Sequence, residues 1–346
     1  MSGKCRLARE TGRRKKDEGG LPLLGPLSYA LSGRNGKIAF DDLSDECRVI
    51  AEAERMVSSV DFEGASKLYG SVRKGGSNFL SFASVSLIAA IGSGNARLFD
   101  RILSDIDAFP RRYGTKEAKQ AVEIIRTWLG LTLYSSAPCP PYIEELDLAA
   151  VPKPWQRQVA YLAIKRLERR GESRTASVLA DALLNLAPGD GVRAEAADIH
   201  LFMAKALIAR LEGRMADAER WCRAAVTAAR DGGIVLPFLG LAMGPKTVIE
   251  RVFVDLAPEL LAKIKNQTNG FFRNLLKFHN RYTGESVNEN LLPRQVFLAS
   301  SLKQGFRYSD IAIRLGVTRN RLHDMVQDLY ADLGIGKRTE IGSKVW

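Results

Sequence analysis

The sequence has few of the residues on which catalytic and metal chemistry usually depend. Its 346 residues include three histidines and four cysteines. The cysteines, Cys5, Cys47, Cys139 and Cys222, are scattered and form no CxxC pair, which excludes a disulfide framework and a zinc site of ordinary spacing. This cysteine usage is typical of a reducing compartment, so we expect a cytoplasmic protein.

Catalytic and nucleotide-binding motifs are also missing. His200, His279 and His323 occur neither at metal-ligand spacing nor in a nucleophile motif. No GxxxxGK[ST] phosphate loop occurs, and the nearest stretch, GLAMGPKT at 240–247, has the wrong spacing and a proline where the loop needs a free amide. We therefore predict that the protein is not an enzyme and that it has no cofactor and no metal site.

Long hydrophobic runs are absent as well. The most apolar stretch, Phe79 to Ile91, is interrupted by Ser81, Ser84 and Ser86. It is shorter than the roughly 20 residues that a membrane-spanning helix needs. The basic, polar start of the chain has no signal-peptide pattern. The sequence thus predicts no membrane partner, and it predicts a buried helix over Phe79 to Ile91.

Positive charge is present in excess and is unevenly distributed. The formal net charge is +12, while hydrophobic residues make up 46% and charged residues 26% of the chain, as in ordinary globular proteins. Residues 1–20 have seven basic and three acidic side chains, and residues 291–346 have nine and five. We expect residues 1–41 to form a basic, disordered segment. A basic C-terminal part is suited to nucleic acid, because neutralised phosphates release counterions.

Residues 42–280 consist of amphipathic helical segments with glycine or proline at their joints, which predicts an all-α region. The periodicity predicts, among others, helices over Arg97 to Ala108 and Glu259 to Phe278. In consecutive pairs of segments, the apolar and small residues recur at the same spacing. This pattern resembles a divergent tetratricopeptide array, in which helical hairpins stack and leave an exposed groove. Residues 213–239 also resemble the end of the helical domain in MalT-like regulators. The polar residues 281–290 lack apolar periodicity and are predicted to be a linker.

The pattern that indicates a specific molecular function lies in residues 291–346. Their apolar residues recur at helical spacing in three short segments, which predicts three compact helices. Gly316, followed by Val317 and Thr318, separates the second helix from the third by the length of a helix-turn-helix connection. Thr318 is expected to cap the third helix, because its hydroxyl can accept from a free amide of the first turn.

The third helix is predicted to span Arg319 to Leu333, with a polar side opposite its apolar side. At these positions the segment resembles the LuxR/NarL-type DNA-binding domain of bacterial transcription regulators. The resemblance is carried by residues 291–295 (LLPRQ), Gly305, 311–315 (IAIRL), 321–325 (RLHDM) and 333–340 (LGIGKRTE).

Four positions depart from the family pattern. Gln295 replaces the usual Glu, and Arg307 stands where a capping Ser is common. His323 takes the place of a usual Lys, and Asp324 that of a common neutral residue. An Asp facing DNA repels phosphate, but it can accept from a cytosine amino group.

The resemblance implies a tetratricopeptide-like helical array followed by a small four-helix domain, residues 291–346, with double-stranded DNA as its partner. Asn320, His323, Asp324 and Gln327 would meet base edges, and the basic residues would hold phosphates. The predicted DNA-binding residues are Thr318, Arg319, Asn320, Arg321, His323, Asp324, Gln327, Lys337 and Arg338.

Family members commonly bind paired half-sites as dimers, so a homodimer is also implied. The expected function is transcription regulation, with the helical array sensing an unidentified ligand or protein partner. The alternative is a helical-repeat scaffold for protein interactions, with a degenerate helix-turn-helix that does not bind DNA.

Overall fold

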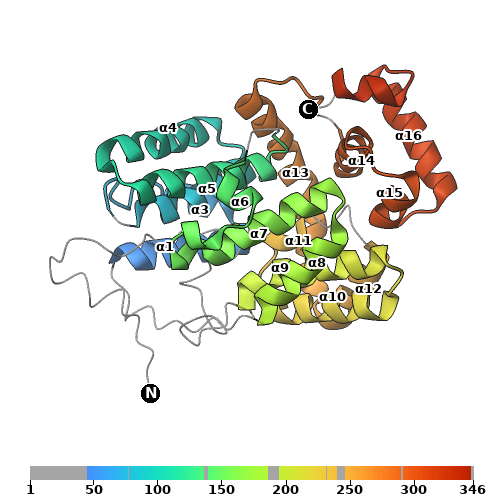
Figure 1. The fold of residues 1–346 in the computed structure, drawn as a ribbon, viewed down its shortest axis with the longest axis horizontal. Helices are drawn as coiled ribbons and strands as arrows, with labels where there is room; N and C mark the ends of the chain where they lie inside the picture. The colour runs from blue at the N-terminus through green and yellow to red at the C-terminus, as the bar shows by residue number, and fades with distance from the viewer. Residues whose placement is uncertain are drawn as a thin grey trace.

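The computed structural model describes residues 45–76, 78–135, 139–185, 195–230, 232–239, 246–289 and 291–343. Every regular element in these ranges is a helix (Figure 1), so the prediction of an all-α protein is confirmed. The predicted basic segment, residues 1–41, lies outside the described residues.

Most of the helices begin or end within a few residues of a glycine, proline or capping side chain, as the sequence pattern predicts. In chain order the elements are α1 (Asp45–Ser58), α2 (Phe62–Lys67), α3 (Phe79–Ser93), α4 (Ala96–Tyr113), α5 (Lys116–Thr132), α6 (Pro141–Glu144), the 3-10 helix η4 (Leu148–Ala150), α7 (Lys153–Arg170), α8 (Ser173–Asn185), α9 (Glu195–Leu211), α10 (Met215–Arg230), α11 (Leu236–Leu239), α12 (Lys246–Leu256), α13 (Pro258–Thr283), α14 (Pro293–Lys303), α15 (Tyr308–Leu315), α16 (Arg319–Leu333) and the 3-10 helix η6 (Arg338–Ser343).

From α1 to α12, helices that are neighbours in the chain mostly pack against each other. They enclose two apolar cores. Leu80, Phe99 and Trp155 lie in the first core, and Phe82 and Phe253 lie in the second. The predicted helix over Phe79 to Ile91 is α3, which is buried on nearly all sides. It contributes to both cores, because its opposite faces contact different helices.

Helix α4 is longer than the sequence predicts. The sequence predicts an end at Ala108, because Pro110 lacks the N–H that would bond the carbonyl of Ile106. The helix instead continues through Pro110 to Tyr113. Rings of Phe109 and Tyr113 contact each other at 4.5 Å between centroids, and the Tyr113 hydroxyl donates to the carbonyl of Gly75 at 2.5 Å. The ring contact within the helix and the hydrogen bond to Gly75 offset the missing hydrogen bond.

Helix α13 returns across the array and ends five residues later than its predicted end at Phe278. It packs along α3, where Asn274 Nδ2 donates to the carbonyl of Gly92 at 2.9 Å. The rings of Phe99 and Phe278 lie 4.6 Å apart between centroids. Figure 1 shows α13 between the array and the C-terminal helices. This position allows one helix to contact both parts of the protein.

The C-terminal helices α14, α15 and α16, together with η6, surround a third apolar core. Leu276 of α13 is fully buried in this core, and Val287 and Leu291 are also buried there. The predicted linker is therefore anchored to the protein at Val287, while most of its other residues are exposed. Its first residues extend α13, and the Asn280 side chain bonds the backbone of Val287 through Oδ1 at 2.8 Å and Nδ2 at 2.9 Å.

We predict that Leu276→Ala lowers the free energy of unfolding by about 2–5 kcal/mol, because it leaves a cavity between α13 and the C-terminal helices. The matched control is Lys277→Ala, which removes an exposed side chain from the next position. It should change stability by about 0.5 kcal/mol or less. Urea denaturation followed by circular dichroism measures both, and equal stabilities would contradict the role given to Leu276.

Candidate nucleic-acid interface

Helices α15 and α16 are joined by a short turn that sets the direction of α16. Gly316 ends α15 with a φ of +70°, a left-handed conformation that favours glycine. The Thr318 hydroxyl accepts from the backbone N–H of Arg321 at 3.3 Å, so the predicted cap is confirmed. Helix α16 spans Arg319 to Leu333 and matches its predicted bounds.

The two sides of α16 differ as the sequence pattern predicts. Leu322, Val326 and Leu329 are buried in the third core. The residues predicted for DNA contact on the other side are all exposed, and α16 lies at the edge of the molecule (Figure 1). They are Thr318, Arg319, Asn320, Arg321, His323, Asp324 and Gln327. The buried side fixes the helix, and the polar side is left for a partner.

Charge is distributed unevenly along this exposed side. Its N-terminal end carries Arg319 and Arg321, whereas Asp324, Asp328 and Asp332 follow toward the C-terminal end. The Asp324 carboxylate lies 4.0 Å from the guanidinium of Arg321, which is the longest distance of an ion pair. An exposed pair at this distance contributes little, so both groups remain able to bind a partner. An anionic partner is therefore favoured at the start of α16.

The two basic residues after α16 have different surroundings. Lys337 is exposed and lies 3.7 Å from the Glu340 carboxylate. Arg338 is partly buried, and it donates through Nε to the carbonyl of Leu302 at 2.9 Å and through Nη2 to that of Phe306 at 3.0 Å. The Arg338 side chain thus satisfies carbonyl groups at and beyond the end of α14. Its partners are more than 30 residues away in the chain, so no local pattern around Arg338 indicates this structural role.

Two of the departures from the family pattern lie at helix starts. Gln295 Oε1 accepts from the backbone N–H of Leu292 at 2.8 Å, so the amide performs the reciprocal capping bond that a Glu would make. Arg307 occupies the N-cap of α15 and makes no capping hydrogen bond with its side chain. Gln295 therefore preserves the capping geometry of α14, whereas Arg307 leaves α15 without a side-chain cap.

The C-terminal helices dock on the array through α15 and the loop before it. Helix α15 contacts α9, and the Arg314 guanidinium lies over the Phe306 ring at 4.4 Å from the centroid. Burial lowers the pKa of Arg314, while the nearby Glu168 carboxylate of α7 opposes this shift. Burial also lowers the pKa of Arg210, whose guanidinium stands beside Gly316. Because the C-terminal helices dock through α15 and the loop before it, most of the polar side of α16 stays uncovered.

One flank of α16 nevertheless faces the array. A groove of about 490 Å³ separates α16 from α12 and α13. Arg321, Met325 and Asp328 line one wall, and Phe253 and Lys265 lie among the residues of the other. A large partner that contacts Arg321 must therefore approach close to the array.

The three histidines lie on different helices and do not form a common site. His200 of α9 lies near Tyr161, with 3.4 Å between Nδ1 and the hydroxyl, and burial lowers its pKa to about 3. The imidazole is therefore neutral at pH 7. His279 of α13 is fully buried and its Nδ1–H donates to the carbonyl of Leu133 at 2.6 Å. His323 is exposed on α16.

In the part of the chain that the structure describes, no three His, Cys, Asp or Glu side chains are grouped so that they could hold a metal ion. None of the helices described combines the length and the apolar character needed to cross a bilayer.

Comparison with protein-family models, curated proteins and solved structures finds no match to this chain. The resemblance of residues 291–346 to the LuxR/NarL-type domain thus depends on the positions named in the sequence analysis.

We predict that Thr318→Ala lowers stability by about 1 kcal/mol, because the amide of Arg321 loses its hydrogen-bond acceptor. Thr318→Ser is the matched control and should retain nearly the full stability, since its hydroxyl can accept the same bond. Equilibrium denaturation compares the two variants. A loss of equal size in both would show that the methyl group of Thr318, rather than the cap, is responsible.

We predict a larger loss for Gly171→Ala than for Gly114→Ala. Both glycines end helices in the left-handed region, at φ +79° and +64°. A Cβ at Gly114 would meet no atom within 4 Å, so only the backbone conformation costs about 1–2 kcal/mol. A Cβ at Gly171 would lie 2.8 Å from the Phe306 ring, which adds about 1–3 kcal/mol of overpacking. Thermal unfolding measures the difference, and equal losses would contradict tight docking at Phe306.

Proposed function

We propose that this protein is a DNA-binding transcription regulator that reads the major groove with α16. One observation carries the proposal: the exposed residues among 318–327 are all polar, while the opposite side of the same helix is buried. In helix-turn-helix proteins the second helix enters the major groove, and its N-terminal residues contact base edges. The basic end of α16 is its N-terminal end, which is consistent with that orientation.

The exposed side chains provide suitable chemistry for both kinds of DNA contact. Asn320 and Gln327 have amide groups that can donate and accept at base edges, as adenine requires. His323 can also bond a base edge, and Asp324 can accept from a cytosine amino group. Arg319 and Arg321, with Lys337, would contact phosphates on either side of the groove.

Arg338 has a different place in this proposal. Its guanidinium bonds two carbonyl groups near the end of α14, so it would support the domain from within rather than contact phosphate. A single helix of this length reads few base pairs, so we expect a homodimer on paired half-sites.

The array would act as the sensing part of a cytoplasmic regulator. Its helices contact α15 directly, and they face the Arg321 flank of α16 across a groove. DNA binding and the position of the array would therefore be physically coupled. A ligand or protein that changes the docking of α15 would change access to α16.

The second candidate is a protein-interaction scaffold with a helix-turn-helix that no longer binds DNA. The acidic side chains of Asp324, Asp328 and Asp332 favour it, because they are exposed on α16 and would repel phosphates. A basic protein surface could meet them instead.

Fluorescence anisotropy of labelled duplex DNA, titrated with the full chain across a salt series, tests the proposal. We expect affinity to fall steeply with salt, as counterion release requires. The double variant Arg319→Ala with Arg321→Ala should reduce the slope of log affinity against log salt by about 2. The matched control is Arg111→Ala with Arg112→Ala, which removes two exposed charges from α4 and should leave the slope unchanged.

The Gly171→Ala variant belongs in the same titration, because it loosens the docking of the C-terminal helices on the array. If this variant binds DNA and the unchanged protein does not, the docked array hinders DNA binding. If neither protein binds at low salt, or if the α16 variant binds as the control does, the regulator proposal fails and the scaffold becomes the better explanation.

A further inference from the structure

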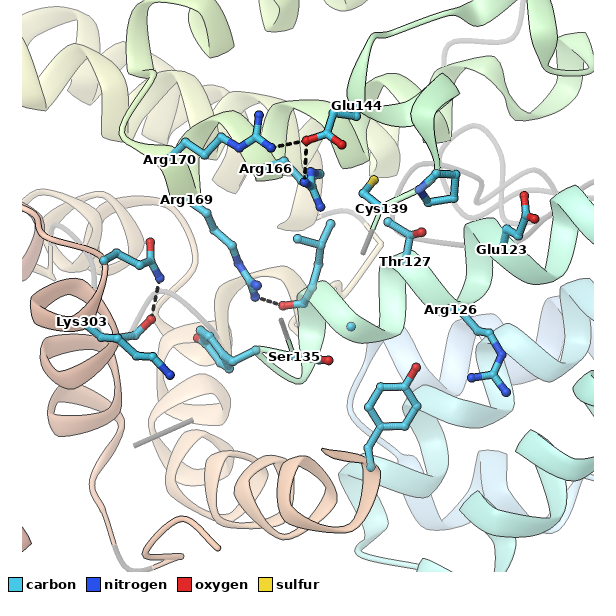
Figure 2. Close-up of a pocket in the computed structure, with 17 residues that line it drawn as sticks. Glu123, Arg126, Thr127, Ser135, Cys139, Glu144, Arg166, Arg169, Arg170 and Lys303 are labelled. Carbon is cyan, nitrogen blue, oxygen red and sulfur yellow. Dashed lines mark hydrogen bonds and ion pairs between the residues drawn. The ribbon is translucent and has the colours of Figure 1, made fainter. Parts of the chain in front are cut away.

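A second cavity lies where the array meets the C-terminal helices. Its volume is about 780 Å³, and its lining comes from α5, α6, α7, α13 and α14 and the residues around them (Figure 2). None of the predicted DNA-binding residues lines it. The cavity therefore belongs to the junction between the two parts and not to the surface of α16.

The lining of this cavity is strongly basic. Arg126 of α5, Arg166, Arg169 and Arg170 of α7, and Lys303 of α14 provide five cationic side chains, against two carboxylates, Glu123 and Glu144. Figure 2 shows Arg169 and Lys303 approaching the same space from different helices. A cavity with this balance of charge favours an anion.

The existing ion pairs do not neutralise the arginines of α7. Arg166 and Arg170 both bond one oxygen of Glu144, the first at 3.1 Å. One carboxylate thus serves two guanidinium groups. Arg126 on the other wall pairs with Asp107 outside the lining, with 3.1 Å between Nε and Oδ1.

Arg169 is held by neutral groups. Its guanidinium donates to the carbonyl of Leu131 and lies over the Tyr134 ring at 5.0 Å from the centroid. No carboxylate of the described residues forms an ion pair with it. Burial lowers the pKa of Arg169, which reflects the cost of holding a charge away from water. An anion placed beside the guanidinium would offset this cost.

The remaining walls supply further polar groups. On α14, Gln304 Nε2 donates to the Ser300 hydroxyl at 2.8 Å, and both side chains line the cavity beside Lys303. Thr127 lines the wall formed by α5. An anion held by Arg169 would therefore have hydrogen-bonding groups from the array on one side and from the C-terminal helices on the other.

We propose that this cavity binds a small organic anion bearing phosphate or carboxylate groups, through Arg169, Arg170 and Lys303. Guanidinium forks bind both kinds of anion in a bidentate manner. The volume is in the range of cavities for organic ligands, which favours such a ligand over a bare inorganic ion. Because the ligand would join α7 to α14, it strengthens the docking of the C-terminal helices. Its role as the effector rests on the proposed function, whereas its binding does not.

Thermal unfolding of the full chain in pyrophosphate, in citrate and in sodium chloride of equal ionic strength tests the site. We expect a saturable rise in Tm of about 2 °C or more over chloride with at least one of the two anions. A response to pyrophosphate alone assigns a phosphate ligand, and a response to citrate alone assigns a carboxylate ligand.

The variants Arg170→Gln and Lys303→Gln should lose most of this rise. They are preferred to Arg169→Gln, since Arg169 also supports the fold through Leu131 and Tyr134. Lys119→Gln on the exposed side of α5 is the matched control and should respond as the unchanged protein does.

The proposal is overturned if neither anion raises Tm above chloride, or if both lining variants respond like the control. DNA titrations of the same proteins keep the two proposals distinct. If the protein binds DNA but no anion, only the proposal of an anion-binding cavity fails. If it binds an anion but no DNA, only the proposal of a DNA-binding regulator fails.

Discussion

Helix α13 is the constraint on which the arrangement of the whole chain depends. Along its 26 residues it contributes to all three apolar cores. Ile264 lies in the second core, Leu275 and Phe278 lie in the first, and Leu276 lies in the third. One rigid helix thus holds two faces of the array and one face of the C-terminal helices. Their relative position follows from the order of apolar residues on α13.

The contacts between the two parts are of two kinds, and the difference bears on function. At α13 the contact is apolar and fully buried. At α15 it contains cations with reduced solvation, Arg210 and Arg314, and one aromatic ring, Phe306. Polar interfaces of this sort resemble those between domains that move, whereas an apolar core resists separation. The structure therefore combines a fixed attachment with a contact that charge can alter.

Sequence periodicity predicted most of the helices, because an amphipathic pattern reports which side of a helix is buried. For α16 it gave both the bounds and the exposed residues, since Thr318 and the apolar side of the helix determine them locally. It did not predict the continuation of α4 past Pro110, the packing of Val287 or the role of Arg338, because each depends on a partner distant in the chain. The basic cavity was missed for the same reason: its walls meet only after α14 returns to α7.

The paired hydrogen bonds between Asn280 and Val287 have a mechanical consequence. They close the chain into a loop directly after the last turns of α13, which shortens the path from α13 toward the C-terminal helices. If the contact at α15 opens, this short path favours rotation of the C-terminal helices about the end of α13 over a shift away from the array. Such a rotation would move Arg319 and Arg321 of α16 away from the array, while the contact of the C-terminal helices with Leu276 would change little.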